Sequence, residues 1–352
     1  MTPRGRDGAP LKVDVAVVGA GVAGLACSSA LRESGRVVVV LDKARGVGGR
    51  CATRRVDGQP VDHGVVFLHG SDPEFLAALD PERAPGVLPG WPERIHGSGP
   101  PCQPGAFLAG ERRAAMRQGI SAFPKRLAVG LDIRTGCLVV SLSPGERSVT
   151  VRLEGGGQVV ARTAVLALAA EQSRDLVATL PPGIPEVEAA RILLEAAGTH
   201  PCLTVIAGHA PDTEAPDWDI DYPEDSRILQ LISHDSVKRE KPDWLVMVYQ
   251  ARPRWSRERL SLPPESWSAE VLEEAARLIG PWAARPVWHQ SHTWRYARVD
   301  LGSELTGPML VLLPGGGRLG LAGEIFWPGG GVEAAWSSGR RLAQRVLAEA
   351  EP

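Results

Sequence analysis

The chain begins with a strand, a glycine-rich turn, a helix and a second strand, an order and spacing that few folds accommodate. The apolar run Val13–Val18 leads into the turn Gly19–Gly24, whose sequence is GAGVAG. A helix is expected over Leu25–Glu33, and the apolar run Val37–Leu41 follows it and ends at Asp42. Continuous apolar strands are typical of parallel sheets that are covered on both faces. The segment therefore predicts a Rossmann-like unit that binds a dinucleotide.

Each glycine of this turn has a separate predicted role. Gly19 permits the tight turn out of the strand, Gly21 lets a pyrophosphate approach the backbone, and Gly24 lets the helix pack closely on the strand. The first helical residues, Val22 and Ala23, present backbone N–H groups and a partial positive charge to the phosphates. The turn is therefore the predicted diphosphate site.

The acid at the end of the second strand, Asp42, lies 18 residues after Gly24 (42 − 24), where a carboxylate can bind ribose hydroxyls. It leaves open whether the nucleotide is NAD or FAD. A second glycine-rich segment, 45–50, follows at once and decides this point. Its paired glycines bring backbone close to a cofactor, and its last arginine supplies a cation for the diphosphate. The candidate contacts in and before this segment are Lys43, Arg45, Gly49 and Arg50.

The sequence of residues 42–55, DKARGVGGRCATRR, resembles the glycine-pair signature of flavoproteins in the flavin amine oxidase superfamily. The match is closest to the renalase-like branch. This resemblance implies FAD as cofactor. It also implies an α/β fold in which a Rossmann-like FAD-binding domain of the GR2 type carries an inserted α+β substrate domain on an antiparallel sheet.

Further segments extend the resemblance along the chain. Asp62-His63-Gly64 looks like the family's Asp-x-Gly segment, and Met116–Ser121 looks like its helix start. Gln290–Ala297, QSHTWRYA, is similar to a Trp-Arg-Tyr segment close to the flavin. Leu321–Glu324 is similar to the motif whose acid bonds the ribityl chain, and Gly331–Ala335 to the start of the C-terminal helix. These matches imply FAD contacts at Gly323, Glu324, Gly331 and Val332.

The resemblance also supplies candidates for the chemistry. The flavin accepts the hydride, so the protein need only orient the substrate, tune charge and exclude water. Trp294 is expected to pack against the flavin or the substrate, or else to be a core residue. Arg295 either holds a carboxylate or phosphate of the substrate or forms a plain ion pair. His63 is a candidate proton carrier, as are His289 and His292, because histidine titrates near neutral pH.

The substrate stays open between two classes. The family often continues its Asp-x-Gly segment with Ala-Gln-Tyr-Phe, whereas Val65-Val66-Phe67 here lacks the Gln and the Tyr. A renalase-type substrate would be an off-isomer of reduced NAD(P), with O2 as electron acceptor. A small amine or secondary metabolite is the alternative. Outside the oxidases, a flavin-free escort protein on the same fold and an NAD-only dehydrogenase are the alternatives. Asp42, Arg50 and Gly323-Glu324 argue against the escort protein, and the Gly-Gly-Arg segment and the C-terminal motif argue against the dehydrogenase.

Composition limits the partners. The 352 residues hold 39 Lys and Arg against 41 Asp and Glu, a balance that excludes nucleic acid as main partner. No apolar run approaches the ~18 residues that span a membrane. The five scattered cysteines form no CxxC pair, so they predict no metal site and favour a reducing, cytoplasmic location. The predicted FAD-binding domain comprises 1–70, 112–178 and 301–352, and the substrate domain comprises 71–111 and 179–300.

Overall fold

The computed structural model describes residues 10–80, 82, 84–300 and 302–349. The chain divides into two compact units, each built from segments that are distant in sequence. Unit 1 comprises Met1–Gly49, Pro124–Thr199 and Val299–Pro352. Unit 2 comprises Arg50–Phe123 and His200–Arg298.

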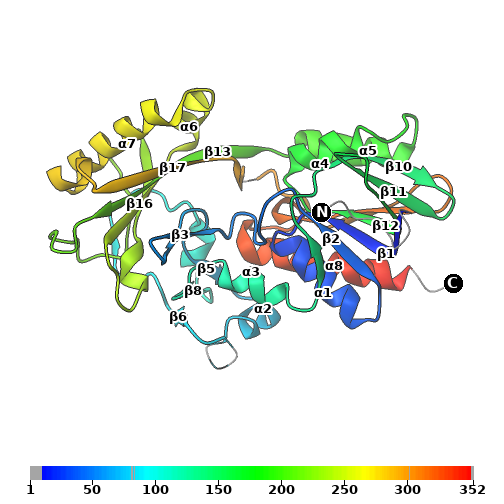
Figure 1. The fold of residues 1–352 in the computed structure, drawn as a ribbon, viewed down its shortest axis with the longest axis horizontal. Coiled ribbons are helices and arrows are strands. Elements are labelled where there is room, and N and C mark those ends of the chain that lie inside the picture. The colour runs from blue at the N-terminus through cyan, green and yellow to red at the C-terminus, as the bar shows by residue number, and fades with distance from the viewer. Residues whose placement is uncertain (1–9, 81, 83, 301, 350–352) are drawn as a thin grey trace. The chain divides into compact units, whose positions relative to one another are not determined.

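Unit 1 is built on an eight-stranded sheet with a parallel centre (Figure 1). The strand β1 (Leu11–Val18) pairs in parallel with β2 (Val38–Leu41) on one side and with β12 (Gln158–Leu166) on the other. The other edge of β12 pairs with β11 in the first half of the strand and with β19 in the second half, so the sheet branches at β12. The remaining strands are β9 (Asp132–Arg134), β10 (Val139–Gly145), β11 (Ser148–Leu153), β18 (Met309–Leu312) and β19 (Arg318–Leu321).

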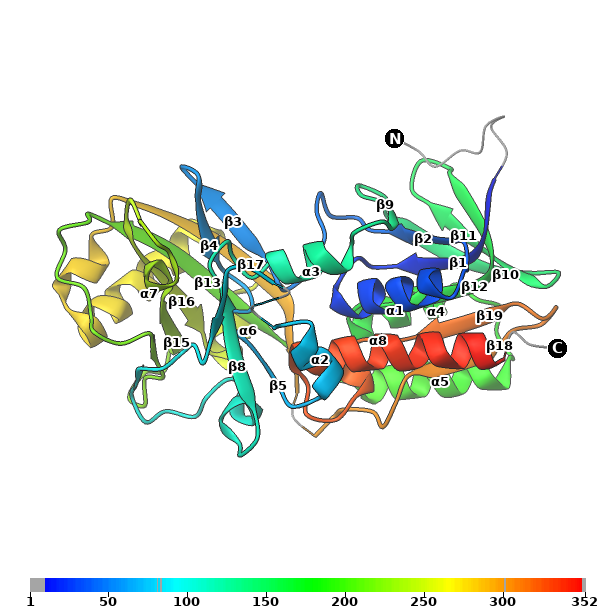
Figure 2. The same cartoon turned by 90° about the horizontal axis from the view of Figure 1, so that it is seen from below.

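Helices cover both faces of this sheet, as the apolar strands predict. Val15 and Val17 of β1 enter the core beneath α1 and α8, whereas Ala16 and Val18 enter the core beneath α4 and α5. Figure 2 shows α1 and α8 side by side on one face. The helices are α1 (Val22–Glu33), α4 (Ala170–Val177), α5 (Pro185–Ala196), α8 (Gly331–Ala348) and the short 3-10 helix η4 (Glu324–Phe326). The helix α3 (Ala122–Leu127) crosses the boundary between the units.

Unit 2 is built on a six-stranded sheet in the order β17-β13-β16-β15-β14-β7. From β13 to β14 successive strands are antiparallel, and β7 joins β14 in parallel. Val205 and Tyr249 face a core with Trp267 of α7, while Ile206 and Val248 face the opposite side. The elements are β7 (Ile95–His96), β13 (Thr199–His209), β14 (Ile220–Asp221), β15 (Leu229–His234), η2 (Asp235–Lys238), β16 (Leu245–Ala251), α6 (Pro253–Arg259), α7 (Pro264–Ile279), η3 (Pro281–Ala284) and β17 (Trp288–Val299).

Two small sheets complete unit 2. The hairpin of β3 (Thr53–Val56) and β4 (Gln59–Asp62) places Val61 against the second face of the large sheet. The other sheet has the strand order β5-β8-β6. Its strands are β5 (Leu68–Gly70), β6 (Val87–Pro89) and β8 (Arg112–Met116), accompanied by α2 (Pro73–Ala77) and the 3-10 helix η1 (Pro104–Phe107).

The predicted fold class is confirmed, with a Rossmann-like unit and a second unit on a largely antiparallel sheet. The units have other boundaries than the predicted domains. Residues 50–70 and 112–123 lie in unit 2 because β5 pairs with β8, and β4 packs on the large sheet of that unit. Residues 179–199 lie in unit 1, since α5 joins the core beneath α4. No helix in the described ranges combines the length and apolar character needed to cross a membrane.

Candidate functional site

The predicted dinucleotide turn of unit 1 has glycine where space requires it. A Cβ on Gly19 would lie 2.4 Å from the carbonyl oxygen of Ala167, and φ there is +107°. A Cβ on Gly24 would lie 2.0 Å from the carbonyl oxygen of Gly19. The Cβ position of Gly21, by contrast, meets nothing within 4 Å. Packing therefore excludes a side chain at Gly19 and Gly24, whereas Gly21 borders open space.

The helix α1 begins directly at this open space. Its N-cap is Gly21, no side chain caps its first turn, and that turn holds no acid. Val22 and Ala23 are buried, so they present backbone N–H groups rather than side chains. An uncapped helix N-terminus beside a backbone without side chains fits the diphosphate of FAD. The residues of this turn therefore fit the cofactor that the resemblance implies.

Asp42 is held in place by backbone donors. Its Oδ2 accepts from the N–H of Ala20 at 2.6 Å, and its Oδ1 accepts from the N–H of Ala44 at 2.7 Å. These bonds fix the carboxylate at the end of β2, next to the glycine turn. Each oxygen retains a second lone pair, which fits the predicted bond to ribose. Lys43 and Arg45 are exposed in the segment that follows.

The paired glycines lie against the glycine turn, backbone to backbone. The N–H of Gly48 donates to the carbonyl oxygen of Ala20 at 2.8 Å, and Gly48 forms an isolated parallel bridge with Gly21. A Cβ on Gly49 would lie 3.5 Å from the Cα of Gly21, and φ of Gly49 is +55°. The two glycine-rich segments therefore form one side-chain-free surface.

The C-terminal motif forms a second cradle in unit 1. The Oε1 atom of Glu324 accepts from the N–H of Gly331 at 2.7 Å, so this acid caps the start of α8. Gly323 is anchored to the side chain of Ser338, whose hydroxyl donates to the Gly323 carbonyl at 2.8 Å. Val332 is buried in the first turn of α8. The assignment of these residues to FAD stays a prediction, and their mutual contacts fit it.

In unit 2, three candidate residues from the sequence, His63, His292 and Trp294, form an aromatic cluster. The ring centroids of His63 and His292 are 5.0 Å apart, those of His63 and Trp294 are 5.5 Å apart, and those of His292 and Trp294 are 4.2 Å apart. The indole N–H of Trp294 donates to the carbonyl oxygen of His63 at 3.0 Å. A Cβ on Gly64 would lie 2.2 Å from the Arg50 carbonyl and 3.0 Å from the Trp294 ring. Gly64 thus lets the chain pass beneath Trp294.

Both imidazoles of this cluster are neutral at physiological pH. Burial, followed by the neighbouring His292 and Arg54, lowers the pKa of His63 to about 3. Burial and the cation of Arg54 lower the pKa of His292 to about 4. Nδ1 of His63 is buried and has no hydrogen-bond partner within the described part of the chain. A base of such low pKa is a poor proton acceptor at pH 7, so a neutral hydrogen-bonding role fits His63 better than proton transfer.

Sequence reasoning missed Arg54, the charged member of this cluster. Its Nη1 donates to Oε1 of Gln290 at 2.8 Å, and its Nη2 lies 3.4 Å from Nδ1 of His292. Burial lowers the pKa of Arg54. The alternation of β17 gives a signal that could have found its neighbours, because Gln290, His292 and Trp294 lie two residues apart and share one face. The arginine itself lies on β3, and only tertiary structure brings it there.

Two other predicted residues lie apart from this cluster. Arg295 is exposed, and the alternation of β17 puts it on the face opposite Trp294, together with the exposed His289. Arg50 donates from Nη1 to the carbonyl oxygen of Ala297 at 3.3 Å, a contact within unit 2. The roles predicted for both arginines stay predictions.

Sequence reasoning also missed a buried ionic cluster next to His63. Nζ of Lys238 lies 2.8 Å from Asp62 and 2.6 Å from Asp235, and Nη2 of Arg239 lies 3.0 Å and 2.7 Å from the same two acids. Burial alone would raise the pKa of Asp62, but Lys238 and Arg239 hold it below its usual value. The cluster ties β4 to η2 and so fixes the strand end that carries His63.

Comparison with known proteins assigns the chain to a family. A model of NAD(P)-binding Rossmann-like domains matches residues 17–80, and the model of flavin-containing amine oxidoreductases matches residues 87–347. The second match spans most of the chain. The chain therefore belongs to the flavin-containing amine oxidoreductase family, whose members are oxidoreductases with FAD as cofactor.

Curated relatives match over a short segment. A putative flavin-containing monoamine oxidase, AofH, of Mycobacterium tuberculosis is 46% identical over 68 residues, which are 19% of this chain and 15% of the relative. Putrescine oxidase of Kocuria rosea is 42% identical over 67 residues, 19% of this chain and 14% of the relative. The matched segment thus spans less than a sixth of the length of either relative.

Solved structures share the fold over almost the whole chain. A putrescine oxidase structure has a TM-score of 0.70 at 17% identity and covers 97% of this chain and all of its own. Cyclohexylamine oxidase from Brevibacterium oxydans IH-35A has a TM-score of 0.72 at 15% identity, again with 97% and 100% coverage. At these identities the likeness establishes the fold alone.

Proposed function

We propose that this protein oxidises a small amine that is bound in its neutral form. Family membership supports the oxidoreductase class, and the named relatives are oxidases of amines. These relatives favour the amine alternative over the renalase-type oxidation of reduced nicotinamides. The side-chain-free surface around Gly21 supports FAD binding and argues against a flavin-free escort role.

The observation that carries this proposal is the lowered pKa of two neighbouring imidazoles, His63 and His292. An amine gives up a hydride from its α-carbon only when its nitrogen is uncharged. The desolvation and the Arg54 charge that disfavour protonated histidine also disfavour an ammonium group at the same place. The cluster therefore selects the reactive form of the substrate.

Residues of each unit have their own tasks. Unit 1 would hold FAD through the glycine turn, Asp42 and Glu324, and bound FAD would supply the two-electron acceptor. In unit 2, Nδ1 of His63 meets the amine nitrogen, and Trp294 packs against the carbon skeleton. Arg295 lies on the face of β17 opposite Trp294, so it could bind a polar group of the substrate only on that face. O2 as final acceptor and a cytoplasmic location are further proposals, the latter supported by the scattered cysteines.

The charge of the cluster refines the substrate class. Arg54 is its cation, and its described partners Gln290 and His292 are neutral. A second ammonium group, as in putrescine, would meet this positive charge. We therefore propose a monoamine as substrate.

The experiment is a peroxide-release assay on the flavin-loaded protein with a monoamine series, putrescine and off-isomers of NADH. We expect turnover of monoamines, with kcat/KM rising with pH as the free amine fraction grows. The variant His63→Gln should lose most of this turnover, while His289→Gln, on the exposed face of β17, should keep it. Turnover of the nicotinamide isomers but of no amine would overturn the proposal.

A further inference from the structure

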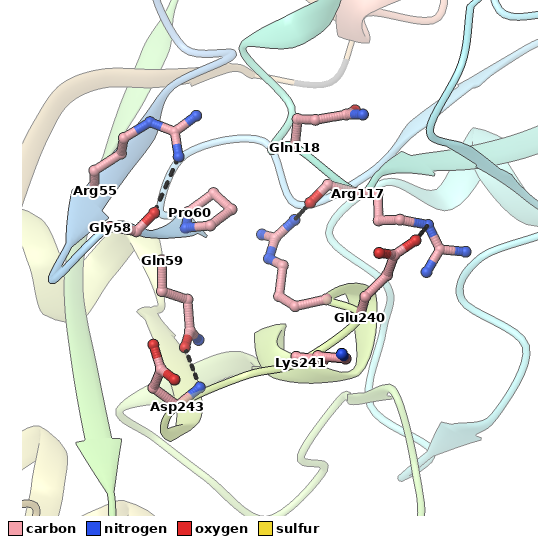
Figure 3. A pocket seen from close by; sticks show the side chains of 10 residues that line it. Arg55, Gly58, Gln59, Pro60, Arg117, Gln118, Glu240, Lys241 and Asp243 are labelled. Atoms are coloured by element: carbon pink, nitrogen blue, oxygen red, sulfur yellow. Dashed lines mark hydrogen bonds and ion pairs between the residues drawn. The ribbon is translucent and has the colours of Figure 1, made fainter.

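A pocket of about 400 Å³ opens in unit 2 among residues that the predicted site does not include (Figure 3). Three segments meet there: the β3–β4 hairpin turn, the residues that follow β8, and segment 239–243 after η2. The volume lies within the range of small-molecule sites. It exceeds what a lone inorganic ion fills.

The pocket wall is rich in cations. Its lining includes Arg55, Arg117, Arg239 and Lys241, against the acids Glu240 and Asp243. Arg117 lies 3.6 Å from Glu240, as the dashed line in Figure 3 marks, while Arg55 and Lys241 are exposed in the lining. The balance of the lining favours an anionic ligand.

Two buried donors of the wall have no acceptor among the residues that the structure describes. Gln59 is 7% exposed; its Oε1 accepts from the N–H of Asp243 at 3.0 Å, and its Nε2 has no hydrogen-bond partner. Arg239 is 8% exposed, and its Nε likewise has no partner within the described residues. Buried donors without an acceptor are rare in proteins, and each calls for an explanation.

The same bonds that hold these two side chains fix the direction of their donors. Nη1 of Arg239 donates to the carbonyl oxygens of Met116 and Arg117 at 2.8 and 3.1 Å, and its Nη2 is held by the buried acids Asp62 and Asp235. The Asp243 backbone fixes the amide of Gln59. Two fixed side chains with unpartnered donors, Gln59 and Arg239, thus line the pocket together with two exposed cations. These are Lys241 and Arg55, whose Nη1 donates to the carbonyl oxygen of Gly58 at 3.1 Å.

We propose that this pocket binds the phosphate group of a small phosphorylated molecule. A tetrahedral dianion offers acceptors in several directions at once, which suits donors that arrive from two segments, the β3–β4 hairpin and residues 239–243. Gln59 and Arg239 would supply the fixed hydrogen bonds, and Arg55 and Lys241 would close over the anion from the rim. The remaining volume would hold the body of the ligand.

The test uses isothermal titration calorimetry on the FAD-loaded protein, so that the diphosphate site of unit 1 is filled. The probes are inorganic phosphate and glycerol 3-phosphate, neither of which carries a ring that competes with FAD. We expect saturable binding, at least tenfold weaker in the double variant Arg55→Gln/Lys241→Gln. The control Arg254→Gln/Arg285→Gln removes two exposed charges elsewhere in unit 2 and should bind like wild type.

A second variant tests the buried donor separately. Gln59→Glu keeps the oxygen that accepts from Asp243 and replaces the unpartnered donor with an anion, so it should abolish binding. Tighter binding of glycerol 3-phosphate than of phosphate supports a phosphorylated ligand, and equal binding supports free phosphate at the same site. The proposal is overturned if neither probe binds the wild type, or if the Arg55/Lys241 variant binds as tightly as its control.

Discussion

Replacing Gly21 and Gly24 separately by alanine distinguishes a cofactor surface from mere close packing. Gly21 has an extended backbone with φ of −74°, which alanine adopts readily, and its Cβ position is open. Gly21→Ala should therefore change the stability of the apoprotein by less than about 0.5 kcal/mol. The new methyl would occupy the space through which the diphosphate approaches, so we expect FAD affinity to fall at least tenfold, about 1.4 kcal/mol.

Gly24→Ala should behave in the opposite way. Its Cβ would lie 2.0 Å from the Gly19 carbonyl oxygen and 3.2 Å from the Cβ of Ala167, so backbone must move. Overpacking of this kind costs about 1–3 kcal/mol. We expect a lower urea midpoint for the apoprotein, followed by poor FAD retention.

The assay pairs urea unfolding of the two apoproteins with a flavin fluorescence titration. Gly35→Ala is no suitable control, since φ there is +80°, but Gly307→Ala is, because its Cβ position has no neighbour within 4 Å among the described residues and its φ is not positive. Gly307 lies before β18, outside both glycine-rich segments. A Gly21→Ala protein that binds FAD like wild type, or that is destabilised as much as Gly24→Ala, would show that Gly21 does not border the cofactor.

Three further predictions address unit 2. Lys238→Met should leave two buried carboxylates with a single cation, which should lower the free energy of unfolding by about 3–5 kcal/mol. Lys241→Met, at an exposed lysine, should change the free energy of unfolding little. Equal urea midpoints for the two variants would contradict the role of the buried cluster. The pKa of His63 is about 3 in the folded protein, against an ordinary value of 6.5, so the unfolded state binds more protons between these two values and stability should fall as pH drops through that window. His63→Gln should flatten this fall, and an unchanged pH profile of Tm would contradict the lowered pKa. Arg54→Gln should raise kcat/KM for putrescine relative to a monoamine by about tenfold, because it removes ~1.4 kcal/mol of charge repulsion. An unchanged ratio of kcat/KM values would show that Arg54 does not discriminate between the substrates by charge.

The sequence predicts unit 1 well because the motif that specifies this fold lies within a short stretch of the chain. The spacing of Gly19, Gly21 and Gly24 from Asp42 encodes a turn, a helix and a parallel strand within 24 residues (42 − 18), and the structure has all of them. The domain boundaries were less accessible. Strand pairing between β5 and β8 joins residues more than forty positions apart, and no local pattern announces such a partner.

The cluster in unit 2 was predicted only in part. His63 and Trp294 came from the family resemblance, and the structure brings them together. Arg54 could not be found, because on a β-strand an arginine that faces a cluster looks like one that faces solvent. The ionic cluster was hidden for a related reason, since Lys238 and Arg239 lie in a charged run that composition alone would assign to the surface.

The most direct test of the central claim is the visible spectrum of the purified protein, followed by anaerobic mixing with amines. We expect a yellow protein that releases FAD on denaturation. Its flavin absorbance should bleach on mixing with a monoamine such as cyclohexylamine and should bleach more slowly with putrescine. It should not bleach with off-isomers of NADH. A colourless protein that cannot be reconstituted with FAD, or a flavin that every amine leaves oxidised, would contradict the account.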